Sequence, residues 1–197
     1  MVRTLIKLGL SLAITMAQGQ ALALTVFACE PEWAALTQTL LPSAKVYSAT
    51  HHLQDPHHIE ARPSLIAQLR NADMAVCTGA ELEAGWLPML QAKASNPKVQ
   101  NGQPGMFYAA DHVSLVHPFK GTVTPFSGDV HVQGNPHVHA DPRRLLAVAR
   151  ALAPRLSAIA PQDKAGIERQ LQQFETALTG KIQAWEQLAK PLRGRSV

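Results

Sequence analysis

The chain has 197 residues, of which 46% are hydrophobic and 16% charged, so it can bury one ordinary core and is too apolar for a disordered chain. Its formal charge of +4 is small and scattered, and only 5% of its residues are aromatic, which leaves little for phosphate binding or base stacking. We therefore expect no nucleic-acid partner.

The N-terminus is typical of a cleaved secretory signal over residues 1–23. Arg3 and Lys7 form a charged start, residues 8–17 form an apolar stretch, and Ala21-Leu22-Ala23 offers small residues before a cleavage point. The apolar stretch is shorter than the roughly 18–20 residues that a membrane span requires. We therefore expect an exported, soluble mature chain.

The next segments alternate between strand and helix. Short apolar runs predict strands, and apolar residues at helical spacing predict helices. In chain order the expected elements are a strand at 24–29, a helix at 33–41, a strand at 45–49, a helix at 63–71 and a strand at 74–77. This alternation predicts an α/β fold with a parallel sheet flanked by helices on both faces.

The second half of the chain begins less regularly and ends as helix. We expect a helix from Gly79 to Leu90 and a brief extended piece at 98–100, followed by a Gly- and Pro-rich loop over 101–136. Long loops in compact domains usually have a function. A helix capped by Asp141 should follow, and apolar residues at steps of three and four predict a long C-terminal helix over 161–191.

The two cysteines, Cys29 and Cys77, each end a predicted strand. In an oxidising compartment they can form a disulfide if the strands are neighbours, or they can be two small buried residues. Both alternatives remain open. A zinc finger is excluded because there is no C-x₂-C spacing and neither cysteine has a histidine nearby.

Seven of the nine histidines fall in two short windows, residues 51–58 and 131–139. They are His51, His52, His57, His58, His131, His137 and His139. Neutral imidazole binds Zn²⁺, Cu²⁺ and Ni²⁺, and both windows lie in predicted loops at the carboxyl edge of the sheet. The two windows therefore predict a site for a divalent transition metal.

Each window contains an Asx-Pro-His sequence, Asp55-Pro56-His57 and Asn135-Pro136-His137, in which the proline fixes the backbone ahead of the ring. His57 and His137 are therefore the leading ligand candidates. His131 is a lesser candidate for a third ligand, ahead of Glu60.

Four motifs in this order resemble the metal-binding receptor subunits of bacterial ABC transporters for zinc and manganese. They are Asp55-Pro56-His57 followed by Pro63-Ser64, Asn71-Ala72-Asp73 before a strand, Thr78-Gly79-Ala80-Glu81 followed by Trp86-Leu87, and Pro136-His137-Val138-His139-Ala140-Asp141-Pro142. The resemblance covers almost the whole mature chain.

The resemblance implies a two-lobed periplasmic receptor that passes its metal to a membrane permease. On this basis 24–160 is the N-terminal metal-binding lobe, 161–191 is the linking helix, and 192–197 begins a second lobe that the sequence lacks. His57 and His137 match two of the four metal ligands. Because histidine-rich sites favour zinc, we expect Zn²⁺ as the transported ligand rather than Mn²⁺. A monomer is expected.

Two other functions compete with import. His137-Val138-His139-Ala140-Asp141 matches the start of the H-x-H-x-D-H pattern of metallohydrolases, but Pro142 stands where that pattern needs histidine and no later histidine follows. We therefore expect no enzyme. A periplasmic zinc chaperone that works without a transporter would need the same reversible site, and the sequence does not separate it from an import receptor.

Overall fold

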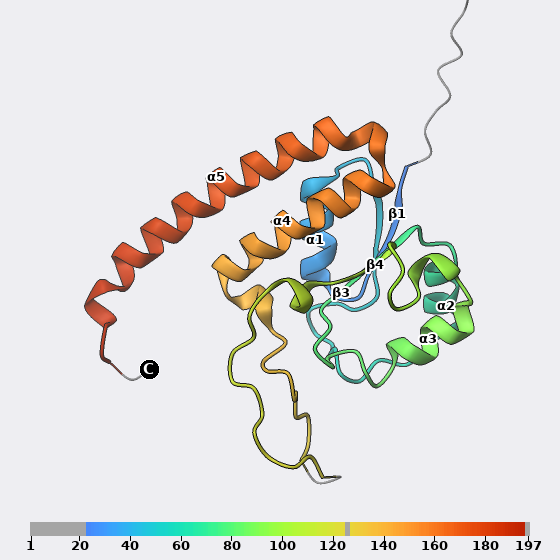
Figure 1. Ribbon diagram of the computed structural model, residues 1–197, viewed down its shortest axis with the longest axis horizontal. Helices are drawn as coiled ribbons and strands as arrows, with labels where there is room; N and C mark the ends of the chain where they lie inside the picture. The colour runs from blue at the N-terminus through green and yellow to red at the C-terminus, as the bar shows by residue number, and fades with distance from the viewer. Residues whose placement is uncertain (1–22, 125–126, 196–197) are drawn as a thin grey trace, which may run out of the picture.

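The computed structural model describes residues 23–124 and 127–195, and a four-stranded parallel sheet lies at its centre (Figure 1). The predicted signal peptide lies outside these residues except for Ala23. The strand order is β2-β1-β3-β4, and every neighbouring pair is parallel. The strands are β1 (Thr25–Ala28), β2 (Lys45–Ser48), β3 (Met74–Cys77) and β4 (Met106–Tyr108).

Alternate residues of each strand enter two separate cores, one on each face of the sheet. In β1, Val26 and Ala28 belong to one core, whereas Phe27 belongs to the other. The period of two in a parallel strand produces this division. The predicted parallel sheet with helices on both faces is confirmed.

The helices lie on the face to which their apolar stripe belongs. Leu65 and Leu90 pack into the core that contains Phe27, while Trp33, Leu152 and Ile167 pack into the opposite core. The helices are α1 (Pro31–Leu40), α2 (Pro63–Arg70), α3 (Leu87–Ala94), α4 (Pro142–Ile159) and α5 (Lys164–Ala189). Short 3₁₀ turns lie at Pro97–Val99, Ala109–His112, Val138–Ala140, Pro161–Asp163 and Lys190–Leu192.

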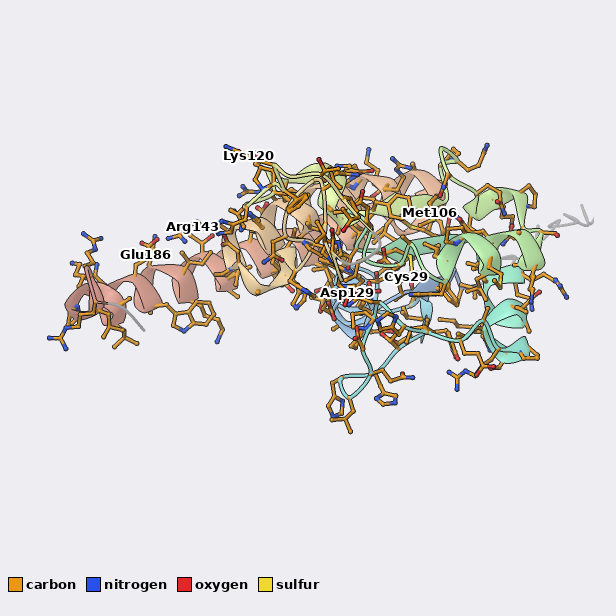
Figure 2. All side chains as sticks on the ribbon, turned by 90° about the horizontal axis from the view of Figure 1, so that it is seen from below. Cys29, Met106, Lys120, Asp129, Arg143 and Glu186 are labelled. Atoms are coloured by element: carbon orange, nitrogen blue, oxygen red, sulfur yellow. A yellow bond between two sulfur atoms is a disulfide. The ribbon has the colours of Figure 1, made fainter. Side chains whose placement is uncertain are left out.

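Helix α5 runs back across α4 and extends past the body of the lobe (Figure 1). Its first half packs on the lobe through Ile167, whereas Trp185 and Leu188 near its far end are exposed. Arg143 of α4 and Glu186 of α5 form an ion pair between the two helices (Figure 2). Within the part of the chain that the structure describes, every helix is too short or too polar to cross a bilayer.

Two local predictions are wrong. The helix expected from Gly79 begins only at Leu87, because Gly79, Ala80 and Glu81 have left-handed φ angles of 79°, 48° and 71° and form a turn instead. The extended piece expected at 98–100 is replaced by the Pro97–Val99 turn, and the fourth strand is β4. This strand is only three residues long and follows a Gly- and Pro-rich stretch, so its apolar pattern is too short to detect.

The cysteines form a disulfide, which resolves the alternative that the sequence left open. Cys29 directly follows β1 and Cys77 ends β3, one position beyond the pair Ala28–Val76, and their Cα atoms lie 4.8 Å apart. Figure 2 labels Cys29. Both side chains are fully buried. The disulfide therefore ties the ends of two strands together beneath the loops that carry the histidines.

Candidate metal centre

Three loops meet at the carboxyl edge of the sheet: residues 49–62 after β2, 78–86 after β3, and 113–141 before α4. Open parallel sheets bind ligands at this edge because their strands all end there. His57, His131 and His137 line one pocket of about 380 Å³ between the first and third loops.

His57 is held by the residue two positions before it and by a distant tryptophan. Asp55 Oδ1 accepts a hydrogen bond from the His57 backbone N–H at 3.0 Å and lies 2.7 Å from His57 Nδ1. Trp86 Nε1 donates a hydrogen bond to the Pro56 carbonyl at 2.8 Å, which fixes the loop next to His57. The backbone and ring contacts of His57 lower the pKa of the Asp55 carboxyl, so Asp55 accepts as a carboxylate.

His131 is held by the turn that follows β3, 51 residues away in the chain. Its Nδ1 lies 2.9 Å from the carbonyl oxygen of Ala80. The next backbone N–H, from Val132, donates to Glu81 Oε2 at 2.8 Å. Two contacts therefore attach the long loop to the same turn.

The turn is itself fixed from inside the protein by Glu83. The Glu83 carboxylate accepts hydrogen bonds from the backbone N–H groups of Thr78 at 2.6 Å and Gly79 at 3.0 Å, and Glu83 is buried. Glu81 is exposed, but Glu83 supports backbone instead of a ring.

The two histidines face each other, with Nε2 of His57 3.0 Å from Nε2 of His131. The carboxylate oxygen of Asp55 and the carbonyl oxygen of Ala80 only accept hydrogen bonds, so each ring carries its proton on Nδ1. In two neutral rings both Nε2 atoms then present lone pairs to each other. Such a contact is favourable only when a cation, a metal ion or an added proton, lies between the two nitrogens.

His137 lies next to this pair on the rim. Its ring centroid is 6.1 Å from that of His57, and its backbone N–H donates to Asn135 Oδ1 at 2.9 Å. Partial desolvation lowers the pKa of His137, and the neighbouring His139 lowers it further, which favours the neutral ring that binds metal. Both Asx-Pro-His sequences thus use the Asx side chain to hold the backbone of the histidine, which adds to the proline effect.

His139 belongs to a separate contact. Its Nδ1 lies 2.9 Å from Glu32 Oε1 at the start of α1, and its ring packs edge-on against Trp33. Burial acts to raise the pKa of Glu32, but the contacts with His139 outweigh it and lower that pKa overall. The Glu32 carboxylate is therefore charged and orients the His139 ring.

The other histidines of the first window lie away from this cluster. His51 and His52 are exposed and pack against each other, and His58 is exposed with Nε2 3.9 Å from Asp129. His117 and Asp129 line the pocket with the three site histidines, although the sequence did not identify them. They lie in the irregular part of the long loop, where no spacing pattern marks them.

Within the described residues, the candidate ligands do not form a complete metal shell. Among the described residues, the one group of three or more possible ligand atoms within 4.8 Å of one another is Cys29, Cys77 and Glu83, and its two sulfurs are in the disulfide. His57 and His131 therefore supply one preformed nitrogen pair, with His137 beside it.

The chain forms a parallel α/β lobe with imidazoles at its carboxyl edge and a long helix leading away, which is the arrangement that the sequence resemblance implied for the N-terminal lobe of a metal-binding receptor. The family model described as zinc-uptake complex component A, periplasmic, matches residues 26–197. The chain belongs to this family of zinc-type periplasmic receptors.

The relatives agree with the family but are longer. The high-affinity zinc uptake system protein ZnuA of Yersinia pestis is 25% identical over 170 residues, which cover 81% of this chain and 51% of that protein. The chain thus spans about half the length of this curated relative.

Solved structures share the fold of the lobe. A crystal structure of ZnuA matches with a TM-score of 0.67 at 21% identity, covering 88% of this chain and 61% of the other. Zn(II)-bound AdcA of Streptococcus pneumoniae matches with a TM-score of 0.65 at 21% identity, covering 83% and 32%. A Mn-bound periplasmic metal-binding protein of Candidatus Liberibacter asiaticus matches at 0.64 and 17% identity, covering 82% and 54%.

Proposed function

We propose that this chain captures Zn²⁺ in the periplasm, through His57 and His137 with His131 as the third ligand, and delivers it to the permease of an ABC importer. The observation that carries the proposal is the pair of Nε2 atoms of His57 and His131, which face each other at 3.0 Å with both Nδ1 atoms already engaged. A divalent metal satisfies both lone pairs at once.

The donor set supports zinc over manganese. The three candidate ligands are imidazoles, and nitrogen-rich sites favour Zn²⁺, whereas Mn²⁺ accepts more carboxylate. The family description and the Yersinia pestis relative both refer to zinc uptake. The Mn-bound structural neighbour shares the fold only, so it does not argue for Mn²⁺ here.

Location and partner follow from the same family. The predicted leader and the word periplasmic in the family description support export of the chain. The aspartate of the metallohydrolase-like sequence has a structural role: Asp141 caps α4 by accepting from the Arg143 backbone N–H at 2.9 Å, as expected from the sequence. We infer that the lobe acts as a receptor and not as an enzyme.

The test is a titration of the full chain with Zn²⁺ in competition with a chelating dye. We expect one bound ion per chain and at least a tenfold loss of affinity in His57→Ala and in His137→Ala. His52→Ala is the matched control, because His52 is exposed and lies outside the cluster. Unchanged affinity in both site variants would refute the assignment.

Delivery is tested in cells, where deletion of the gene should lower zinc accumulation at limiting zinc.

A further inference from the structure

A second pair of imidazoles adjoins the pair formed by His57 and His131. The ring centroids of His137 and His139 lie 6.0 Å apart with their planes at 89°. Two imidazoles on one Zn²⁺ have centroids roughly 5–6 Å apart, because each nitrogen lies about 2.1 Å from the ion. A small rotation of the exposed His137 ring would therefore let both rings bind the same ion.

Glu32 prepares His139 for this role in the way that Asp55 prepares His57. His139 Nδ1 is buried and lies 2.9 Å from Glu32 Oε1. Because the carboxylate only accepts hydrogen bonds, a neutral His139 ring carries its proton on Nδ1 and keeps the lone pair on Nε2. A carboxylate behind a histidine is the usual support of a metal ligand, since it fixes the tautomer and raises the basicity of the ring.

The wall behind His139 is rigid. Trp33 packs edge-on against the ring with centroids 6.3 Å apart, is fully buried, and donates from Nε1 to Thr78 Oγ1 at 2.7 Å. A purely structural histidine in this place would need no free nitrogen. The observed contacts fix one face of the His139 ring and its Nδ1.

The four rings are successive neighbours in space. Consecutive centroids from His131 to His57, His137 and His139 are separated by 5.2, 6.1 and 6.0 Å. His137 stands between the pair formed by His57 and His131 and the pair that it forms with His139. An ion held by His137 can therefore exchange one set of partners for the other without leaving the lobe.

We propose that His137, His139 and Glu32 form a second position for a divalent metal ion, adjoining the His57–His131 position and sharing His137 with it. This inference rests on the proposed function, since it concerns the path of the same ion. The two positions are alternatives for one ion, because His137 is shared and two dications this close would repel each other.

The test removes the first position and asks whether the second remains. In the full chain with His57→Ala and His131→Ala together, we expect one Zn²⁺ to bind at least tenfold more weakly than in the unmodified chain. Adding His139→Ala should weaken this residual binding at least tenfold more, and adding Glu32→Gln should weaken it by several-fold. Co²⁺ replaces Zn²⁺ as a spectroscopic probe, and its visible absorption should change on addition of His139→Ala.

The outcomes separate this inference from the proposed function. If the unmodified chain binds Zn²⁺ and His57→Ala weakens it, but the residual binding of the double variant is absent or indifferent to His139→Ala and Glu32→Gln, only the second position is refuted. If the unmodified chain binds no Zn²⁺, the proposed function fails and this inference fails with it. Far-UV circular dichroism of each variant confirms folding, and the Glu32→Gln variant keeps the size of the side chain.

Discussion

Nε2 of His57 and Nε2 of His131 lie 3.0 Å apart, although the two residues are 74 positions apart in the chain and each ring already directs its Nδ1 at an oxygen. Neither loop alone would bring these nitrogens together. The contact depends on Ala80, whose carbonyl holds the long loop in place over the first one. The consequences of this arrangement can be measured one residue at a time.

Replacing His131 by alanine should weaken Zn²⁺ binding about as much as replacing His57. Loss of an outer partner of a metal ligand typically costs roughly 10–100-fold, and loss of a ligand should cost at least that much. Competition titration measures the effect. His117→Ala is the comparison, since His117 lines the same pocket from the same loop. If His131→Ala binds as tightly as the unmodified chain, the facing pair is not the metal site.

Asp55→Asn should lower zinc affinity by roughly 10-fold while leaving the fold intact. The asparagine oxygen still accepts from the His57 backbone N–H, so the turn is retained, but the negative charge behind Nδ1 is lost. Asp111→Asn is the matched control, because Asp111 is exposed and lies outside this pocket. Equal affinity of the two variants would show that Asp55 only shapes the loop.

The anchoring of the long loop by Glu81 can be separated from the chemistry of the ligands. Glu81→Ala removes the acceptor of the Val132 N–H, so His131 should be held less firmly and Zn²⁺ affinity should fall by several-fold. Glu81→Gln keeps a carbonyl oxygen at the end of the side chain and should restore most of that affinity. Because Glu81 is exposed, the free energy of unfolding of both variants should lie within about 0.5 kcal/mol of that of the unmodified chain. A failure of glutamine to restore binding would contradict the anchor.

Much of the fold could be predicted from the sequence, because the strands that end at Cys29 and Cys77 are dense apolar runs and Asp141 is a typical helix cap. The turn at Ala80 could not, since a left-handed φ at alanine leaves no mark in the sequence. The same holds for the site. The two Asx-Pro-His sequences predict His57 and His137 as ligands, but the contact of His57 with His131 depends on the course of a long irregular loop.

The disulfide should make a large contribution to stability. Cys29 and Cys77 are separated by 48 positions. Closing a loop of this size lowers the conformational entropy of the unfolded chain and so stabilises the folded protein by about 2–4 kcal/mol. In the double variant Cys29→Ala with Cys77→Ala, the free energy of unfolding measured in urea should fall by this amount. A strong reductant present during unfolding should lower the urea midpoint of the unmodified chain toward that of the variant. Equal midpoints for variant and oxidised chain would contradict the prediction.

Glu30 should make the protein less stable as the pH rises. Burial raises the pKa of Glu30 well above its usual value, and the nearby Glu83 raises it further, so the folded state keeps a proton that the unfolded chain releases. For a raised pKa the stabilising contribution is complete below the unfolded pKa and is lost as the pH rises through the folded one.

Glu30→Gln replaces the acid by a neutral amide that can still donate to Glu83. As the pH rises above the ordinary carboxyl pKa, the free energy of urea unfolding of the variant should therefore increase relative to that of the unmodified chain. Glu60→Gln, at an exposed position, should show no such gain. Parallel pH profiles for Glu30→Gln and the unmodified chain would mean that Glu30 is ionised in the folded protein.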